Sequence, residues 1–403
     1  MSIKCLYPFT NLTVNPSGTV APCCKYNLNK TDTEIEIDNV RDKNIEELFN
    51  QPAMEKIRQQ FLNGEKPAAC QVCWDEESSG IKSMREFRNK YLAQWNPHRP
   101  VYETKFDHPE IITLDFKFSS LCNLKCRICG PYCSSNWLKE SLDTGRYHEH
   151  TINIFSSYAE RKFANNEENF EIFKKLLPNL HIIEFYGGEP LMQPEHFKIM
   201  EILKDSEYLS NIYLYYNTNG TLYDDKYINI WNKAGIVELN ISLDDIQERF
   251  EYQRFPAKWD EVLNNLLKFK KSCKETVTIA LCCTISVYNI YYLDEFLKFN
   301  FENLNMMIRT NLLHWPDEMC IKHLPNHVKK IIADKLLNIP KEHLTLLASG
   351  SSIESIIAFI NDSESDIKFT DMLFDTTYKH DQYRNQSFKE TFSEYWGILN
   401  APN

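Results

Sequence analysis

Strand-like runs alternate with helical patterns over residues 110–313, and this alternation constrains the fold more than any other feature of the sequence. The strand-like runs are rich in β-branched and aromatic residues, and they cover 111–118, 181–186, 212–216, 236–243, 277–287 and 306–311. Helical patterns lie between them, at 170–177, 195–203, 226–233, 259–271 and 293–299. This order predicts parallel βαβ units with buried strands. Such a sheet closes into a barrel or stays open, and in either case ligands bind at the carboxyl ends of the strands.

The sequence on either side of this region has a different character. Residues 1–105 contain five cysteines and two helical stretches, at about 45–62 and 76–95. Two prolines interrupt any helix in segment 96–100, which is therefore predicted to be a linker. After residue 313 the pattern is helical again, most clearly at 326–337. We expect a small cysteine-rich domain at 1–105, an α/β domain at 106–313 and a helical cap over the strand ends at 314–403.

Composition narrows the choice of partners and compartment. The chain has 45 Lys and Arg against 56 Asp and Glu, a net charge of −11 without a long run of one sign. A nucleic-acid surface would normally carry a basic stripe, so nucleic acid is not indicated. We see no signal peptide and no apolar segment long enough for a bilayer, and we expect a cytoplasmic protein without a membrane partner. Thirteen cysteines in a reducing compartment point to metal or cluster ligation rather than disulfides.

Three cysteines follow directly on the first predicted strand. Cys122, Cys126 and Cys129 are spaced so that a short loop can fold around one cluster. Iron–sulfur clusters normally take four thiolates, so three would leave one corner iron open to another ligand. The alternative is a structural zinc loop, which would usually close its tetrahedron with a fourth Cys or His. Cys133 could supply that fourth ligand.

A glycine pair follows the second predicted strand, at the edge where the cysteine loop is expected. The sequence there is Tyr186-Gly187-Gly188-Glu189-Pro190. Two glycines let a backbone approach a ligand closely. Alone, the pair fits an ordinary strand-to-helix turn. Placed one βα unit after the cysteine loop, it predicts a ligand cradle beside the cluster.

Together these residues resemble the radical S-adenosylmethionine (radical SAM) superfamily of enzymes. The resemblance covers roughly residues 111–313, and the cysteine signature is its most specific part. Asn219, in Thr218-Asn219-Gly220 after the third strand, and Ser242 on the fourth also match the habits of that superfamily. One departure is Ile128, because the residue before the last cysteine is often aromatic in the family.

The resemblance implies a partial (β/α)₆ barrel and a catalytic 4Fe–4S cluster held by three cysteines: Cys122, Cys126 and Cys129. The methionine amino and carboxylate groups of S-adenosylmethionine would chelate the open iron. Gly187, Gly188, Glu189 and Pro190 would hold that amino group. Asn219 would also contact the cofactor, Ser242 would face the ribose, and Ile128 would pack against the adenine.

The cysteines of the first hundred residues form a second set. Cys5, Cys23, Cys70 and Cys73, with a glycine before the second, resemble the twitch or SPASM type of auxiliary-cluster domain, which usually follows the barrel and here precedes it. The resemblance implies an auxiliary 4Fe–4S cluster on these four thiolates, without an open iron. Cys24 could replace Cys23 as a ligand. A Cys₄ zinc site is the alternative.

The favoured function is a radical SAM enzyme that cleaves S-adenosylmethionine to a 5′-deoxyadenosyl radical and abstracts hydrogen from an organic substrate. The resemblance leaves the substrate open among peptides, nucleotides and small metabolites, and it implies an electron donor such as flavodoxin or ferredoxin. Two other classes are an iron–sulfur electron carrier or redox sensor without turnover and a zinc-binding module. The segment 187–190 discriminates, because a pure carrier needs no S-adenosylmethionine cradle.

Some further residues have an ordinary structural interpretation. Arg309 on the last strand is a candidate for substrate binding, or it forms a salt bridge at the strand end. Five cysteines are expected to be small buried hydrophobes: Cys133, Cys273, Cys282, Cys283 and Cys320. Two of them are adjacent on one strand and must face opposite sides of the sheet.

Overall fold

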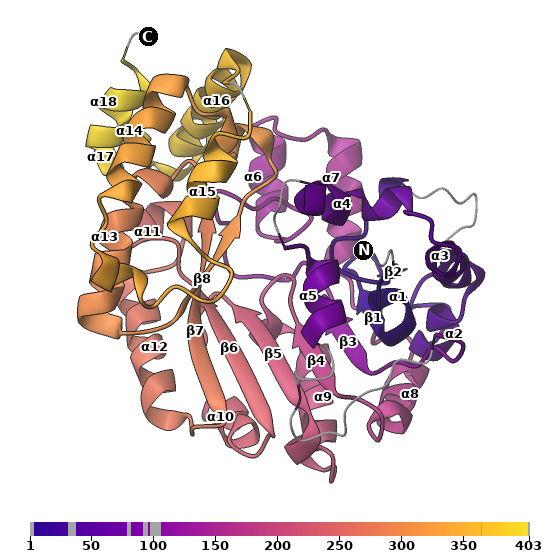
Figure 1. Ribbon diagram of the computed structural model, residues 1–403. Coiled ribbons are helices and arrows are strands. Elements are labelled where there is room, and N and C mark those ends of the chain that lie inside the picture. The colour runs from indigo at the N-terminus through magenta and orange to yellow at the C-terminus, as the bar shows by residue number, and fades with distance from the viewer. Residues whose placement is uncertain are drawn as a thin grey trace.

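One twisted sheet organises the molecule, with helices along its outer face and at its carboxyl edge (Figure 1). The computed structural model describes residues 4–30, 38–78, 82–91, 96, 106–363 and 365–401. The sheet has eight strands in the order β2-β1-β3-β4-β5-β6-β7-β8. In the part of the chain that the structure describes, no helix is long and apolar enough to cross a bilayer.

The predicted strands and helices of the barrel are present in the predicted order. The strands are β3 (Thr113–Phe116), β4 (Ile182–Phe185), β5 (Tyr213–Thr218), β6 (Ile236–Ser242), β7 (Val277–Ile285) and β8 (Ile308–Leu312). Each is parallel to its neighbour. The connecting helices include α8 (Glu168–Leu176), α9 (Pro194–Lys204), α10 (Asp225–Trp231), α12 (Trp259–Ser272) and α13 (Leu293–Phe299). The prediction of a partial (β/α)₆ barrel is therefore confirmed.

Alternation along these strands separates an apolar face from a polar one. Phe116, Phe185 and Tyr216 stand in register on adjacent strands, are buried, and stack in a row with ring centroids 6.0 and 4.9 Å apart. Their sequence neighbours point the other way, because successive side chains of a strand alternate between faces. Asp115 and Glu184, also in register, therefore lie together on the inner face.

The N-terminal region contributes two strands to the same sheet. Strand β1 (Asn11–Val14) pairs in parallel with β3, from Asn11 opposite Thr113 to Val14 opposite Phe116, and β2 (Val20–Ala21) pairs antiparallel with β1. The sheet thus continues across the boundary that we placed at residue 105. The expected linker at 96–100 lies outside the described residues except for Asn96, whose side-chain amide donates to two barrel carbonyls.

Each of the two long helical stretches expected in this region is divided. The first comprises α2 (Ile45–Phe49) and α3 (Pro52–Leu62), because Pro52 starts a new helix after an extended residue. The second comprises α4 (Gln71–Ser78) and α5 (Met84–Tyr91). A short helix, α1 (Tyr7–Thr10), precedes β1. In Figure 1, α5 lies in front of the sheet near β4 and β5.

The C-terminal region is helical, as expected. It contains α14 (Asn326–Leu337), which has the predicted bounds, and α15 (Ile353–Ile360), α16 (Ile367–Arg384), α17 (Phe388–Thr391) and α18 (Ser393–Leu399). Figure 1 shows these helices gathered at the carboxyl end of the sheet, beyond β7 and β8. The same end carries three barrel helices, α6 (Trp137–Asp143), α7 (Glu149–Ser156) and α11 (Gln247–Gln253).

Candidate active site

The cysteine loop lies at the carboxyl edge of the sheet, directly after β3. Cys126 and Cys129 are within hydrogen-bonding reach of each other, and that bond is the largest cause of the raised pKa of Cys129 and the lowered pKa of Cys126. Burial raises the pKa of Cys122 to about 12. Ligation of a metal or a cluster requires the thiolate, so binding would remove the protons that burial keeps on Cys122 and Cys129.

Backbone hydrogen bonds fix this loop against the segment that ends α11. The amide of Lys125 donates to the carbonyl of Phe255, and the amide of Arg127 to the carbonyl of Gln253, both at 2.8 Å. The indole Nε1 of Trp137 donates to the carbonyl of Cys126 at 3.1 Å. The three thiols are thus held on a rigid loop.

The glycine pair packs against the cysteine loop. Gly187 and Gly188 have φ angles of 71° and 54°, a left-handed conformation that favours glycine. A Cβ on Gly188 would lie 2.3 Å from the carbonyl oxygen of Leu121. The same oxygen accepts hydrogen bonds from the amide of Glu189 and from Nε2 of Gln193, both at 2.9 Å. We expected these glycines to approach a ligand, and the structure shows that Gly188 first of all approaches the cysteine loop.

Glu189 joins the glycine loop to the loop after β5. Its carboxylate is fully buried and accepts hydrogen bonds from Thr218 Oγ1 and the Asn219 amide, both at 2.7 Å, and from the Leu191 amide at 3.1 Å. Burial raises the pKa of Glu189, and these hydrogen bonds counteract part of that rise. Its side chain therefore connects the glycine loop to the loop after β5.

Asn219 completes the connection to the cysteines. Its Nδ2 donates to Asn123 Oδ1 at 2.8 Å and lies 3.8 Å from Cys122 Sγ. The structure thus brings the cysteine loop, residues 187–190 and Asn219 together at one edge. Ser242 is half-buried at the end of β6, and Ile128 is half-buried within the cysteine loop. Contacts of these residues with a cofactor stay predictions.

Positive charge surrounds the cysteine loop from within the protein. Arg254, at the end of α11, forms a buried ion pair with Asp244 at 2.7 Å, and Asp244 also accepts from the Thr284 amide. The charge of Arg254 adds to the lowering of the pKa of Cys126. Its Nε is buried without a hydrogen-bond partner among the described residues. A cluster held by three thiolates carries net negative charge, so a buried guanidinium with a spare donor fits it.

The second set of cysteines surrounds one cavity. Cys5, Cys23, Cys70 and Cys73 all line this cavity, together with Arg85 and other residues. Cys24 is exposed, and its sulfur lies 3.6 Å from Met84 Sδ. The arrangement favours Cys23 over Cys24 as the fourth ligand of an auxiliary cluster. Burial raises the pKa of all four lining thiols, that of Cys5 to about 12.

A site for a single metal ion would be the alternative to a cluster. Among the described residues, no group of three or more Cys, His, Asp or Glu side chains could hold a single metal ion. The fit of each cysteine set to a cluster therefore rests on the surroundings of its thiols.

The other cysteines follow our expectation in part. Cys283 and Cys320 are buried, and Cys282, in register with Ser242, is half-buried on the face opposite to Cys283. Cys133 was expected to be a buried hydrophobe, and this was wrong. It is exposed close to the cysteine loop, where its charge would raise the pKa of Cys129.

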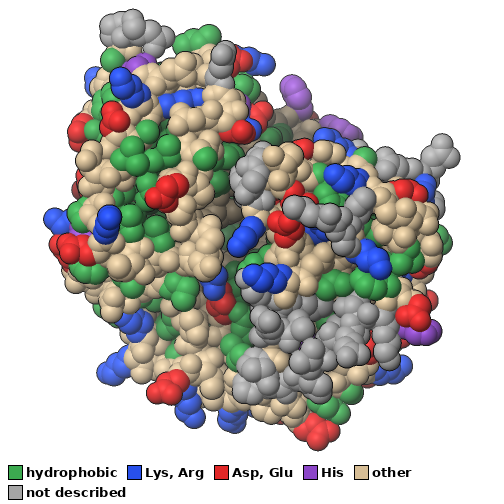
Figure 2. Space-filling model, in the orientation of Figure 1, with side chains coloured by type: hydrophobic (Ala, Val, Ile, Leu, Met, Phe, Trp, Pro, Cys, Tyr) green, Lys and Arg blue, Asp and Glu red, His purple; other side chains and the backbone are tan. Residues whose placement is uncertain are grey.

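A cavity lies against strands β4, β5, β6 and β8 of the sheet. Its empty volume is about 730 Å³, and its lining consists of Tyr7, Met84, Phe87, Glu184, Tyr186, Tyr213, Tyr215, Glu238 and Arg309. In Figure 2 the visible face is hollowed between the C-terminal and N-terminal regions, with charged side chains at the margin. We regard this cavity as the candidate substrate chamber.

Ion pairs and tyrosines order the chamber wall. Glu238 accepts from Tyr213 at 2.5 Å and pairs with Arg309 at 2.8 Å, so Arg309 both lines the chamber and forms a salt bridge. Glu184 accepts from Tyr186 at 2.7 Å. Burial, and next the charge of Asp115, raises the pKa of Glu184 to about 7. Sequence analysis missed these carboxylates. The available signal was the presence of acidic residues inside strands that were expected to be buried on both faces.

Comparison with known proteins identifies the two cysteine regions. Residues 116–299 match the family model of the Radical SAM superfamily, and residues 5–74 match that of SPASM, an iron-sulfur cluster-binding domain. The chain belongs to the radical SAM superfamily. Its radical SAM domain implies a 4Fe–4S cluster and S-adenosylmethionine, and its SPASM domain implies an auxiliary iron–sulfur cluster. The predicted order, with the auxiliary domain before the barrel, is confirmed.

Individual relatives are distant. The chain is 29% identical to a probable GTP 3′,8-cyclase of Methanococcus maripaludis over 43% of this chain and 47% of that protein. It is 26% identical to a GTP 3′,8-cyclase of Haemophilus ducreyi over 34% of each. The chain thus spans less than half the length of these curated relatives.

Solved structures with low sequence identity are also similar to this chain. For anSMEcpe with bound AdoMet, the identity is 21%, the coverage 55% of this chain and 58% of that one, and the TM-score 0.39. For Streptococcus suis SuiB, the identity is 12%, the coverage 83% and 69%, and the TM-score 0.35.

Proposed function

We propose that this radical SAM enzyme reductively cleaves S-adenosylmethionine at a cluster on Cys122, Cys126 and Cys129 and abstracts hydrogen from an organic substrate. The observation that carries the proposal is the interlocking of three loops at one edge of the sheet. Asn219 contacts the cysteine loop, Glu189 binds the loop of Asn219, and the glycine pair packs on Leu121. A cluster bound there would supply one electron to the sulfonium of S-adenosylmethionine.

The protein's own groups would place that cofactor. Three cysteines leave one corner iron without a protein ligand, where the methionine end of S-adenosylmethionine can bind. The packing of Gly188 on the carbonyl of Leu121, at the start of the cysteine loop, supports a role for residues 187–190 in holding that end of the cofactor. Fixing the sulfonium close to the cluster removes the entropic cost of bringing them together.

The auxiliary cluster would be held by the four lining thiols, Cys5, Cys23, Cys70 and Cys73. With four thiolates it has no open iron, so its expected role is electron transfer or support of the chamber wall. Radical chemistry also requires a reductant, and we propose a flavodoxin or ferredoxin as the donor. The substrate belongs to the peptides, nucleotides or small metabolites that can enter a polar, tyrosine-lined chamber.

Anaerobic reconstitution tests this function. Protein with iron and sulfide restored should form 5′-deoxyadenosine when dithionite and S-adenosylmethionine are added. Cys126→Ala should abolish this product. Cys133→Ala is the matched control, since it removes a neighbouring thiol outside the motif and should leave the product. Fully loaded, folded protein that forms no 5′-deoxyadenosine would instead be an electron carrier, and stoichiometric zinc in place of iron would favour the binding module.

A further inference from the structure

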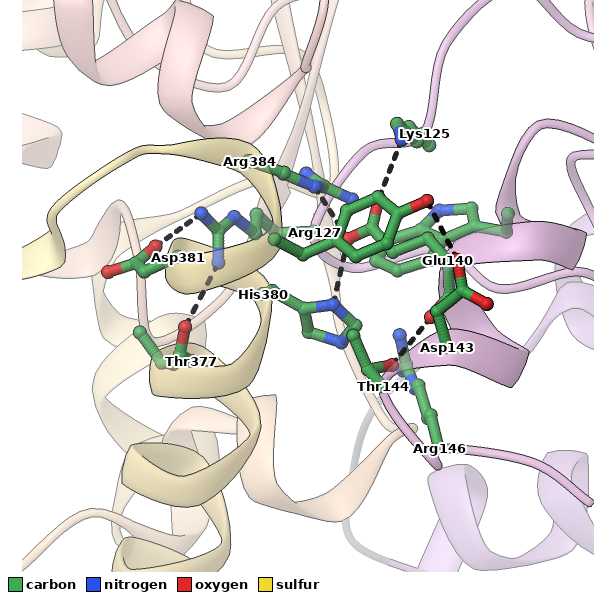
Figure 3. A network of polar contacts seen from close by, with 12 residues as sticks. Lys125, Arg127, Glu140, Asp143, Thr144, Arg146, Thr377, His380, Asp381 and Arg384 are labelled. Atoms are coloured by element: carbon green, nitrogen blue, oxygen red, sulfur yellow. Dashed lines mark hydrogen bonds and ion pairs between the residues drawn. The ribbon is translucent and has the colours of Figure 1, made fainter.

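A buried polar network ties the cysteine loop to the C-terminal helix α16 (Figure 3). Glu140 of α6 is its centre, and its carboxylate is fully buried. It contacts Lys125 Nζ at 2.7 Å, His380 Nδ1 at 2.8 Å and Arg384 Nε at 2.7 Å. Lys125 precedes Cys126, and His380 and Arg384 are one turn apart on α16. One carboxylate therefore connects the loop to the C-terminal region.

The residue after Cys126 makes a second connection. The guanidinium of Arg127 is fully buried, contacts Asp381 of α16 at 2.5 Å, and donates to Gln386 Oε1 at 2.9 Å. It also lies 4.0 Å from the ring centroid of Tyr252. Both sequence neighbours of Cys126 are thus anchored to α16 or to its partners.

Arg384 has hydrogen-bonding capacity that this network does not use. Its Nε binds Glu140, whereas Nη1 and Nη2 are buried and have no hydrogen-bond partner among the described residues. The guanidinium packs 4.5 Å from the ring centroid of Trp137, whose indole donates to the carbonyl of Cys126. Buried donors without acceptors are costly, so their retention calls for an acceptor that the protein itself does not provide.

The position of Arg384 indicates that acceptor. Glu140, which Arg384 binds at 2.7 Å, also pairs at 2.7 Å with Lys125, the residue before Cys126, so the guanidinium lies next to the cysteine loop. Sulfur atoms of an iron–sulfur cluster accept hydrogen bonds from such groups, which together with nearby positive charge set the reduction potential.

We infer that Arg384 contacts the radical cluster and tunes its reduction potential, donating Nη hydrogen bonds to the sulfur atoms at its Cys126 corner. This inference rests on the proposed function, which makes Cys126 a ligand. Reduction adds negative charge to the cluster, so a buried guanidinium beside it favours the reduced state. Helix α16 lies beyond residue 299, where the match to the radical SAM family model ends, so this chain would complete its cluster environment with its own C-terminal region.

The test is a redox titration of reconstituted full-length protein, followed by electron paramagnetic resonance of the signal that responds to S-adenosylmethionine. Arg384→Gln should make the midpoint potential more negative, lowering the reduced-to-oxidised ratio at a fixed potential about tenfold, which is about 59 mV for one electron. Arg384→Lys keeps the charge but loses the fork of donors, so it should shift the potential in the same direction by less. Arg249→Gln is the matched control, because that guanidinium on α11 binds Asp245 and Glu295 instead.

Each outcome decides one question. Unchanged potentials in iron-loaded Arg384→Gln and Arg384→Lys would overturn the inference and leave the proposed function intact. A wild-type signal that ignores S-adenosylmethionine would overturn the proposed function itself. If Arg384→Gln loses its iron or its circular dichroism spectrum, Arg384→Lys alone decides, since it preserves an ion pair with Glu140. An equal shift in Arg249→Gln would also refute the specific role of Arg384.

Discussion

Replacing Glu140 with glutamine should destabilise the fold, because three cationic or donor groups converge on this buried carboxylate. Burial opposes its ionisation, but His380, Arg384 and Lys125 more than compensate and lower the pKa of Glu140 from 4.5 to about 2. Burial lowers the pKa of His380 to about 4, so at neutral pH this imidazole is uncharged and donates Nδ1–H. The carboxylate therefore balances the charges of Lys125 and Arg384.

The size of the effect follows from this shift. A pKa lowered by about 2.5 units corresponds to about 3 kcal/mol in the free energy of unfolding at neutral pH. Breaking a buried ion pair by removing one partner costs about 3–5 kcal/mol, so the two routes agree at about 3 kcal/mol. The pKa of Glu140 is lower in the folded state than in the unfolded state. Its stabilising contribution is therefore complete above about pH 4.5 and is lost as the pH falls through about 2.

Urea unfolding of the reduced full-length chain, followed by tryptophan fluorescence, measures this loss. Glu140→Gln should lower the free energy of unfolding by about 3 kcal/mol at pH 7, and the difference from wild type should narrow below pH 4.5. Glu171→Gln is the matched control, because Glu171 forms only an exposed pair with Lys174, and its midpoint should not move. A loss below about 1 kcal/mol for Glu140→Gln, or a difference independent of pH, would refute the reasoning.

Three further predictions address other parts of the site. Cys23→Ala should remove the auxiliary iron in a metal assay, whereas Cys24→Ala should retain it, since only Cys23 lines the cavity. Gly188→Ala should lower the free energy of unfolding by about 1–3 kcal/mol, and more than Gly145→Ala, because both have positive φ but only Gly188 would place its Cβ against a backbone oxygen. Glu184 keeps its proton up to about pH 7 in the folded state. Its contribution to the free energy of unfolding should therefore fall as the pH rises from 4.5 towards 7. Urea titrations at pH 5 and pH 8 should show that Glu184→Gln lacks this part of the decrease in the free energy of unfolding.

The barrel was predictable because each of its strands is a short apolar run between turn signals, a local property. The apolar residues of each run form the buried outer face of the sheet, and β-branched and aromatic residues favour strands. The helix expected at 45–62 failed for an equally local reason, because Pro52 favours an extended residue before it and a new helix start. The signal was present in the sequence and was outweighed by the helical periodicity around it.

Some residues of the site lie close together in the sequence, and others meet only in the folded structure. The cysteine motif and the glycine pair are short and were found, but the contact of Gly188 with Leu121 depends on two loops meeting at the sheet edge. Glu184 and Glu238 share a wall only through the register of β4, β5 and β6. Arg384 contacts Glu140 and Trp137, which bind the cysteine loop, from a helix whose sequence shows only ordinary helical periodicity. Contacts of this kind are set by tertiary packing, and no spacing rule in the sequence encodes them.

Strand β1 joins the N-terminal auxiliary domain to the barrel. Because β1 pairs in parallel with β3, the segments that hold Cys5 and Cys23 are joined to the same sheet as the barrel. Tyr7 and Met84 line both the cavity of the four thiols and the candidate substrate chamber, so the two spaces share a wall. Burial lowers the pKa of Lys117, the residue after β3, but the charges of Asp115, Cys24, Cys133 and Cys23 raise it by more, so the net pKa is raised. A domain that precedes the barrel in sequence can therefore place its cluster beside the chamber, where electron transfer to or from a bound substrate is geometrically reasonable.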